Sequence, residues 1–264
     1  MQAISQIRDF LLDMDGTIYL GNRLFEGTLP LLNRIREKGG RAIFLTNNSS
    51  ASPAMYVEKL HRLGIPAVAD DIFTSGDAAA VSLLQHFQKP PAVYLLGTPQ
   101  LADQLTGYGL RIVNDTEIPP DCVLLGFDKT LTYERLETAC RLIDGGIPYF
   151  ATHPDRVCPV ENGFIPDAGA MIALIQTATG RTPTVFGKPE AAMAAAASAR
   201  YHLCMETTAM VGDRLSTDIR FANNAGMTAV LVLSGETSLA DYQAQHEVHA
   251  DWIFPSVREL CDAL

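Results

Sequence analysis

The segment FLLDMDGT, residues 10–17, joins a short apolar run to two aspartates and a glycine. The run at 10–12 predicts a buried strand that ends at Asp13. Asp13 and Asp15 leave this strand with one residue between them, so both carboxylates can face one pocket, and Gly16 permits a sharp turn. One carboxylate can accept a phosphoryl group as a nucleophile, and the other can act as acid and base. The alternative interpretation is a turn with Asp and Gly at favoured positions.

Three more apolar runs end in polar residues in the same way. They lie at 42–45 before Thr46, at 209–211 before Gly212, and at 229–233 before Ser234. Helix-like segments separate these runs, which predicts a parallel sheet wrapped by helices. Because ligands bind outside the carboxyl ends of the strands in such sheets, we expect these polar residues to converge on one site.

Two motifs have the donors that a phosphate group requires. Thr46, Asn47 and Asn48 supply a hydroxyl, carboxamides and backbone N–H groups after a strand. Lys188 precedes Pro189 at the expected start of a helix, where an anion is favoured. The alternatives are a helix N-cap loop for the first motif and a solvated lysine for the second.

Asp213 and Asp218 are two further carboxylates, located after the strand at 209–211. Beside Asp13 and Asp15 they would repel one another, because each like-charge pair about 4 Å apart costs on the order of 4 kcal/mol at an effective dielectric near 20. Mg²⁺ with oxygen ligands removes this repulsion and binds a substrate phosphate as well. The alternative is that each residue is a helix-capping or surface acid.

The strand and helix pattern restarts in the middle of the chain. Strands are predicted at 92–96, 122–125 and 148–151, and helices around 101–105 and 133–144. We therefore expect an inserted α/β domain at 79–183, with the first domain formed by 1–78 and 184–264.

Charge and cysteine content restrict the partners and the compartment. The net charge of −10 argues against a nucleic acid polymer as a partner, because a phosphate backbone requires clustered Lys and Arg. The five cysteines are scattered without a C-x-x-C pair, which is typical of reduced thiols and predicts a cytoplasmic location. No run of about 18 apolar residues is present, so we expect no membrane span.

The four motifs, at 13–17, Thr46, Lys188 and 212–218, occur in the order found in the haloacid dehalogenase-like phosphatases, and the chain resembles this family over nearly its whole length. Asp13 and Thr46 are 33 residues apart, and Thr46 and Lys188 are 142 apart. This spacing resembles the type IIA subfamily, whose large cap lies between the second and third motifs. The resemblance implies a Rossmann-like parallel-sheet core with a large inserted α/β cap domain.

The resemblance also implies roles for the motif residues. Asp13 would be the nucleophile and a Mg²⁺ ligand, and Asp15 the acid and base, with its backbone carbonyl on the metal. Thr46, the Asn47 amide and Lys188 would hold the phosphoryl group. The remaining implied roles are Mg²⁺ binding by Asp213, support of the metal site by Asp218 and substrate contact by Asn48.

In the predicted cap, residues 151–155 resemble a segment of the type IIA relatives, and this resemblance supports the position of the segment and not its role. The loop at 153–156 is the candidate for reading the leaving group. His153, Asp155 and Arg156 are the candidate contacts, and His153 and Arg156 could meet a second anionic group. The alternative is an ordinary surface loop. Relatives often dimerise through the cap, so a homodimer is also expected.

The expected function is Mg²⁺-dependent hydrolysis of a small phosphorylated metabolite through an aspartyl phosphate. Relatives act on nitrophenyl phosphate, nucleotides, sugar phosphates, phosphoglycolate or pyridoxal phosphate, and the sequence leaves the substrate open. A phosphotransferase or phosphomutase would share Asp13 and Asp15, but the 33-residue gap argues against it. A non-catalytic phosphometabolite-binding protein could dispense with Asp13 or Lys188, and both are present.

Overall fold

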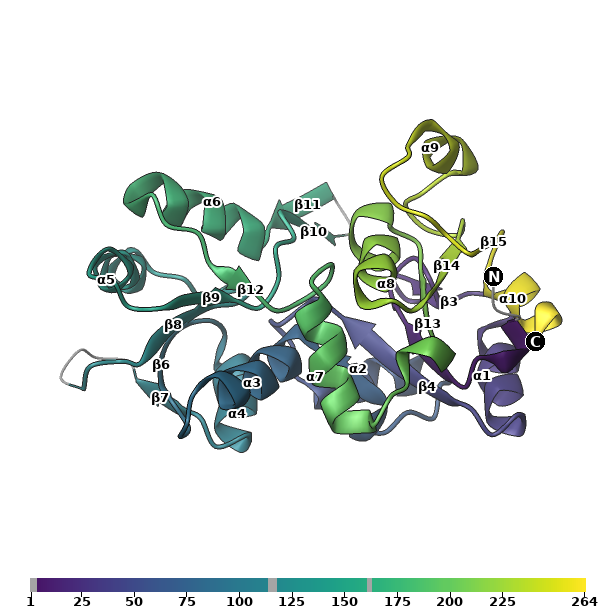
Figure 1. The fold of residues 1–264 in the computed structure, drawn as a ribbon, viewed down its shortest axis with the longest axis horizontal. Coiled ribbons are helices and arrows are strands. Elements are labelled where there is room, and N and C mark those ends of the chain that lie inside the picture. Colours follow the sequence, from purple (N-terminus) through teal and green to yellow (C-terminus); the bar gives the residue numbers. More distant parts are fainter. Residues whose placement is uncertain (1–3, 114–117, 161–162) are drawn as a thin grey trace. The chain divides into compact units, whose positions relative to one another are not determined.

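The computed structural model describes residues 4–113, 118–160 and 163–264. The chain forms two compact units (Figure 1). The core unit comprises Met1–Thr46, Pro53–Phe73 and Lys188–Leu264, and the inserted unit comprises Asn47–Ser52 and Thr74–Gly187.

The core unit is built on a six-stranded sheet in the order β15-β14-β13-β1-β4-β5. Its strands are β1 (Asp9–Leu12), β4 (Arg41–Thr46), β5 (Ile72–Thr74), β13 (Thr208–Gly212), β14 (Thr228–Val232) and β15 (Trp252–Phe254). β1 lies between β13 and β4 and runs parallel to both, with Phe10 beside Ala209 and Ala42. The predicted α/β class with a parallel sheet is confirmed.

Every residue of β1, β13 and β14 is buried. Successive side chains in a strand point to opposite faces, so both faces of this sheet are covered. This explains the uninterrupted apolar runs in the sequence.

The helical segments of the core unit are η1 (Ile4–Gln6), α1 (Thr28–Glu37), α2 (Pro53–Arg62), η2 (Ala69–Asp71), α7 (Ala191–Tyr201), η3 (Met205–Thr207), η4 (Leu215–Ile219), α8 (Arg220–Ala225), α9 (Leu239–Ala244) and α10 (Val257–Ala263). A short hairpin, β2 (Tyr19–Leu20) with β3 (Arg23–Leu24), follows β1.

The strand order brings distant motifs together at one edge of the core sheet. The Asp13 N–H donates to the Val211 carbonyl at 2.9 Å, which continues the pairing of β1 with β13 by one residue. Asp213 follows β13 directly, and Thr46 is the last residue of β4. The carboxyl ends of three adjacent strands therefore hold the first, second and fourth motifs.

The inserted unit has its own five-stranded sheet in the order β12-β9-β8-β6-β7. Its strands are β6 (Ala92–Leu96), β7 (Arg111–Val113), β8 (Cys122–Leu125), β9 (Tyr149–Ala151) and β12 (Thr184–Val185), with a separate hairpin of β10 (Val157–Val160) and β11 (Gly163–Pro166). Its helices are α3 (Ser75–His86), α4 (Pro99–Gly107), α5 (Tyr133–Asp144) and α6 (Ala168–Thr179). Buried Tyr94, Val123 and Ile143 belong to the core of this unit.

The inserted unit begins and ends a few residues outside the predicted range 79–183, and it includes a second piece of chain, Asn47–Ser52. Side chains hold this piece in place. Ser49 Oγ accepts the Phe127 N–H at 2.9 Å and lies 3.0 Å from Thr152 Oγ1, and Thr98 Oγ1 donates to the Ser50 carbonyl at 3.3 Å. The loop after β4 is therefore part of the inserted unit.

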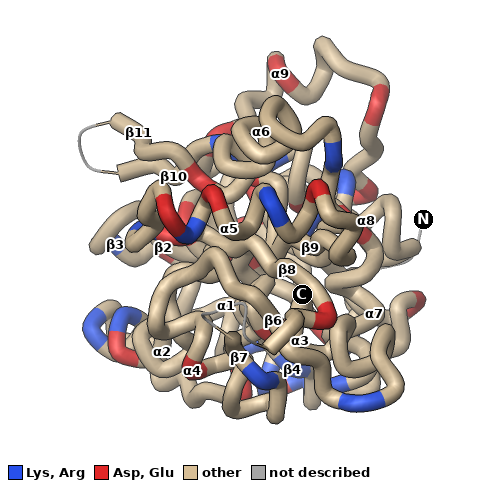
Figure 2. The backbone as a smooth tube through the Cα atoms, turned by 90° about the vertical axis from the view of Figure 1, so that its left-hand side faces the viewer, with Lys and Arg blue, Asp and Glu red and all other residues tan. Residues whose placement is uncertain are grey.

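Acidic and basic residues are interspersed along the backbone of both units (Figure 2). Among the described residues, no helix is both long enough and apolar enough to span a membrane.

Candidate active site

A buried lysine connects two carboxylates in the core unit. Lys188 Nζ donates to Asp13 Oδ1 at 2.6 Å and to Asp218 Oδ1 at 2.7 Å, and the residue is only 2% exposed. Burial lowers the pKa of Lys188, but the two carboxylates raise it more, so the net shift is upward and the ammonium stays charged. The third and fourth motifs thus meet the first at the edge of the sheet.

Asp213 is fixed by the loop that follows β14. Its Oδ2 accepts the Glu236 N–H at 2.7 Å, and its main-chain carbonyl accepts the Thr237 N–H at 3.3 Å. Two glycines leave room for its carboxylate, because a Cβ on Gly16 would lie 2.5 Å from Oδ2 and one on Gly235 would lie 2.0 Å from it. Gly16 has φ +93°, in the left-handed region that favours glycine.

A π-helical turn carries Asp218. In η4 the Ile219 N–H donates to the Arg214 carbonyl five residues earlier, at 3.1 Å. Asp218 Oδ2 accepts the Arg214 N–H at 3.1 Å, and its side chain packs directly on Gly212, where a Cβ would lie 2.3 Å from the Asp218 Cβ. Single π turns occur often at functional sites, and this one directs Asp218 toward Lys188.

Asp13, Asp213 and Asp218 each place a carboxylate oxygen within 4.8 Å of the others. Burial raises the pKa of Asp13 to about 8, with further increases from Asp218 and Asp213 against the lowering effect of Lys188. Burial and Asp218 raise the pKa of Asp213 to about 6. Three carboxylates this close, of which Asp13 and Asp218 share the charge of Lys188, suit a hard divalent cation with oxygen ligands such as Mg²⁺.

Asp15 differs sharply from Asp13 in its surroundings. Its side chain is about half exposed, and its Oδ2 lies 3.9 Å from Lys59 Nζ on α2. The same ammonium lies 4.0 Å above the centre of the Tyr19 ring. The exposed carboxylate lies outside the buried cluster of Asp13, Asp213 and Asp218. Sequence analysis did not identify Lys59, whose position on α2 carries no recognisable motif.

Residues of the second motif divide between the two units. Thr46 ends β4 in the core unit, and Asn47 and Asn48 belong to the inserted unit. Asn47 Nδ2 donates to both carboxylate oxygens of Asp155, at 3.1 and 3.2 Å. Asn48 Oδ1 accepts the Ser50 N–H and hydroxyl, each at 2.8 Å, which makes its side chain part of the local turn.

The three residues predicted to read the leaving group have different environments. His153 is fully buried, and its ring nitrogens lie 2.9 Å from Thr152 Oγ1 and 2.8 Å from Asp167 Oδ1, the arrangement of a structural histidine rather than of a substrate contact. Asp155 is half-buried against Asn47, as described above. Arg156 is exposed, and its side chain makes no hydrogen bond or ion pair within the described part of the chain.

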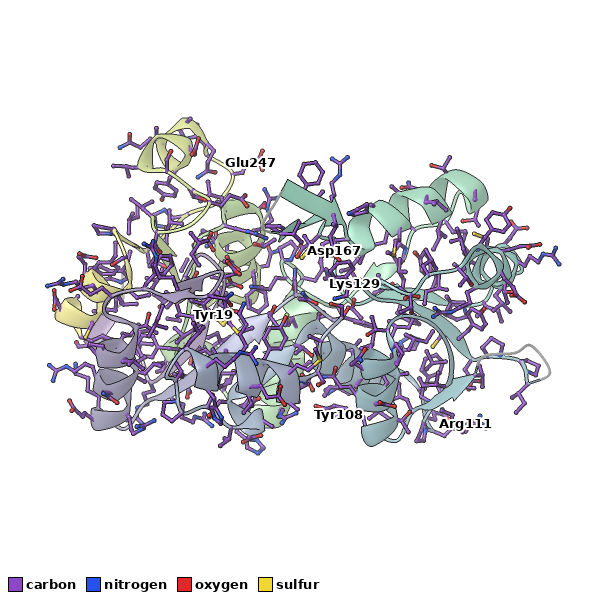
Figure 3. The ribbon with its side chains drawn as sticks, turned by 180° about the vertical axis from the view of Figure 1, so that it is seen from behind. Tyr19, Tyr108, Arg111, Lys129, Asp167 and Glu247 are labelled. Carbon is purple, nitrogen blue, oxygen red and sulfur yellow. The ribbon has the colours of Figure 1, made fainter. Side chains whose placement is uncertain are left out.

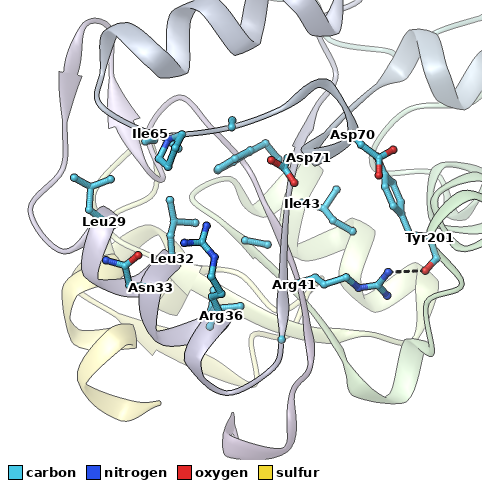
Figure 4. Close-up of a pocket in the computed structure, with 16 residues that line it drawn as sticks. Leu29, Leu32, Asn33, Arg36, Arg41, Ile43, Ile65, Asp70, Asp71 and Tyr201 are labelled. Carbon is cyan, nitrogen blue, oxygen red and sulfur yellow. Dashed lines mark hydrogen bonds between the residues drawn. The ribbon is translucent and has the colours of Figure 1, made fainter.

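A separate pocket of about 260 Å³ lies in the core unit around the start of β4 (Figure 4). Its floor includes Leu32 and Ile43, and Arg41 donates there to the Tyr201 carbonyl at 2.9 Å. Thr46 ends the same strand, and none of the 16 residues lining the pocket belongs to the carboxylate cluster. The motif residues therefore define the candidate active site.

Comparison with protein families agrees with this arrangement. A family model described as haloacid dehalogenase-like hydrolase matches residues 10–111, and a second, described as HAD hydrolase-like, matches residues 185–260. Together the two matches include the residues of the carboxylate cluster and Lys188.

Two curated relatives align with most of the chain. Acid sugar phosphatase of Staphylococcus aureus is 35% identical over 241 residues, which cover 91% of this chain and 92% of the relative. D-glycerol 3-phosphate phosphatase of Mycobacterium tuberculosis is 37% identical over 242 residues, which cover 91% of this chain and 67% of the relative.

Solved structures show the same fold. The 4-nitrophenylphosphatase of Thermotoga maritima superposes with a TM-score of 0.92 at 43% identity, covering 99% of each chain. The glycerol phosphate phosphatase of Mycobacterium tuberculosis in complex with magnesium gives a TM-score of 0.91 at 34% identity, covering 98% of this chain and 78% of the other.

Proposed function

The chain belongs to the haloacid dehalogenase-like hydrolase family, and we propose that it is a Mg²⁺-dependent phosphatase that hydrolyses small phosphate monoesters through an aspartyl phosphate on Asp13. The observation that carries this proposal is the buried Lys188, which is hydrogen-bonded to Asp13 and Asp218 beside the Asp213 carboxylate. A carboxylate nucleophile requires a nearby cation when it attacks an anionic phosphorus centre, and the cluster combines a lysine with oxygen ligands for a metal.

The reaction proceeds in two displacements. In the first, an Asp13 carboxylate oxygen forms a bond to phosphorus while the bond from phosphorus to the substrate oxygen breaks, and Asp15 gives its proton to the departing alcohol. In the second, Asp15 removes a proton from water, whose oxygen attacks the phosphorus and releases inorganic phosphate and the Asp13 carboxylate. Lys188, Thr46 and the amide of Asn47 hold the phosphoryl oxygens in both steps.

Asp13, Asp213 and the main-chain carbonyl of Asp15 would hold Mg²⁺, and Asp218 would support the site through Lys188 and the Arg214 N–H. When bound, the metal supplies positive charge that offsets the carboxylates and the phosphoryl oxygens. It also lowers the pKa of the buried carboxylates, which keeps Asp13 in the ionised form that acts as a nucleophile.

The relatives support small substrates. Those described above are named acid sugar phosphatase, D-glycerol 3-phosphate phosphatase and 4-nitrophenylphosphatase. We propose a substrate of this size class, a sugar or polyol phosphate, for this chain. The homodimer through the inserted unit and the cytoplasmic location stay predictions.

The direct test is release of inorganic phosphate from p-nitrophenyl phosphate with and without Mg²⁺. The wild-type protein should release phosphate only with the metal, and Asp13→Asn should abolish release. Asp144→Asn, a change of the same kind at an exposed position on α5, should retain wild-type activity. Equal activity of wild type and Asp13→Asn would reject the proposal, and a phosphotransferase would release little inorganic phosphate without an acceptor.

A further inference from the structure

We propose that Asp155 is a positioning residue that acts through Asn47, so that the loop at 153–156 sets the geometry of the phosphate-binding motif rather than touching the leaving group. This inference rests on the proposed function, because it assigns a role within the same reaction. It goes beyond that function because it names Asp155 as the residue that orients Asn47, and names the elements that hold Asp155 in place.

The Asn47 side chain has one orientation at this site. A carboxylate only accepts hydrogen bonds, so the carboxamide must present Nδ2 to Asp155, at 3.1 and 3.2 Å from its two oxygens. Asn47 Oδ1 then points elsewhere, toward Gly187, where a Cβ would lie 2.8 Å from it. The carboxylate of Asp155 therefore determines which end of the amide faces which neighbour.

The main chain of Asn47 is held as well. The Ser75 hydroxyl, at the start of α3, donates to the Asn47 carbonyl. Asn47 is only 5% exposed, so water does not compete strongly for these partners. This contact fixes the carbonyl of Asn47, the residue that follows Thr46 directly in the second motif.

Asp155 is itself fixed by the first turn of α6. Its carbonyl accepts the Gly169 N–H at 2.7 Å, and the next carbonyl, of Arg156, accepts the Asp167 N–H at 3.1 Å. Asp167, the N-cap of α6 (Figure 3), also contacts the buried His153 at 2.8 Å. A Cβ on Gly169 would lie 2.2 Å from the Pro154 carbonyl oxygen, so the loop packs tightly on the helix.

The charge and the hydrogen bonds of Asp155 favour a positioning role for this residue over direct contact with anionic groups of the substrate. A carboxylate repels the phosphate and any second anionic group of a substrate, which disfavours Asp155 as a contact for such groups. Its hydrogen bonds to Asn47 are charge-assisted and two in number, the kind of interaction that holds a neighbouring group in one geometry. Groups that contact a transition state are held in their productive geometry by hydrogen bonds from neighbouring side chains that do not themselves contact it.

The test is a double-mutant cycle on Asp155 and Asn47, with kcat and KM measured for p-nitrophenyl phosphate and for glycerol 3-phosphate in the presence of Mg²⁺. Asp155→Ala should lower kcat/KM about 10- to 100-fold, the equivalent of a lost hydrogen bond to a charged group. The loss should be the same factor for both substrates, because both share the phosphate group. Asp155→Asn, which keeps one acceptor oxygen, should restore a large part of the activity.

The double variant Asp155→Ala/Asn47→Ala should be no worse than Asn47→Ala alone, since Asp155 acts only through that side chain. Asp144→Asn serves as the matched control. If the two losses multiply in the double variant, or if the loss depends on the leaving group, Asp155 contacts substrate or acts independently and the proposal is wrong. Wild-type activity of Asp155→Ala would also overturn it.

The outcomes also separate this inference from the proposed function. An inactive wild-type protein would reject the phosphatase assignment and the inference with it. An active wild type with multiplicative losses would reject the inference alone. If Asp155→Ala does not fold, as judged by thermal unfolding, Asp155→Leu with Asn47→Ala completes the cycle, because leucine is close to aspartate in shape and has no acceptor oxygen.

Discussion

The ammonium group of Lys188 lies 2.6 Å from Asp13 Oδ1, inside the core unit and almost without access to solvent. Removal of one partner from a buried pair leaves an uncompensated charge, at a cost of about 3–5 kcal/mol. Loss of Lys188 should therefore affect both the stability of the core unit and the proposed reaction.

Lys188→Ala should weaken both substrate binding and turnover, because the phosphoryl oxygens and Asp13 lose the same cation. We expect a fall in kcat/KM of more than about a hundredfold. Steady-state kinetics with p-nitrophenyl phosphate measure it, and Lys129→Ala, at an exposed position, is the control. Unchanged kcat and KM would exclude Lys188 as a phosphate ligand.

Asp15→Ala should lower turnover by more than about a hundredfold, within the usual contribution of about 10²–10⁴ from a general acid and base. The exposed Asp15 carboxylate makes few contacts, so the thermal unfolding temperature should change little. Rapid-quench measurements should show an aspartyl phosphate that persists, since the second step also requires Asp15. Near-normal turnover would contradict the assignment.

The effect of Mg²⁺ on stability should increase with pH. The pKa of Asp13 is raised to about 8 and that of Asp213 to about 6. A group with a raised folded-state pKa stabilises the fold fully below its unfolded pKa, and this contribution is lost as pH rises through the folded pKa. The metal-free protein should therefore lose stability between about pH 4 and about pH 8.

Mg²⁺ binds the ionised carboxylates, so the rise in Tm that it causes should be larger at about pH 8 than at about pH 5. Thermal unfolding in matched buffers, with and without the metal, measures the difference. Asp213→Asn should reduce the rise at the higher pH. An Mg²⁺ effect that is equal at both pH values would show that these carboxylates do not control metal binding.

Gly235→Ala should weaken Mg²⁺ binding, because the added Cβ would lie 2.0 Å from Asp213 Oδ2 and must displace that carboxylate. Overpacking of this kind costs about 1–3 kcal/mol, which corresponds to a weakening of the metal Kd by about 5- to 150-fold. Titration of Mg²⁺ by calorimetry measures the Kd. Gly107→Ala, where a Cβ meets nothing within 4 Å, should leave the Kd unchanged.

The sequence predicted four strands of the core sheet, β1, β4, β13 and β14, and the position of their motifs, but not the outer strands β5 and β15. Buried parallel strands are continuous apolar runs, and the polar residue that ends each run lies at the carboxyl edge of the sheet. Asp13, Thr46 and Asp213 could be placed by this rule alone. The helix predicted at 133–144 corresponds to α5, whose Thr132 side chain caps its first turn.

Contacts between distant segments were not predictable in this way. His153 is buried because Thr152 and Asp167 supply partners for both ring nitrogens, and neither partner is evident from the local pattern. Gly235 and Glu236 form the loop around Asp213 only because β14 pairs with β13. The short hairpins and the π turn of η4 are too short to produce a hydrophobic periodicity in the sequence, so no sequence pattern predicts them.

The assignment of Asn47–Ser52 to the inserted unit has a consequence for engineering. Ser49 and Ser50 make their hydrogen bonds to Phe127 and Thr98, residues that any exchange of the insertion would replace. A chimaera that swaps Thr74–Gly187 alone would join a foreign domain to a native loop whose partners are gone. The transplantable module is discontinuous, and a recombinant with a new substrate range must carry Asn47–Ser52 together with Thr74–Gly187.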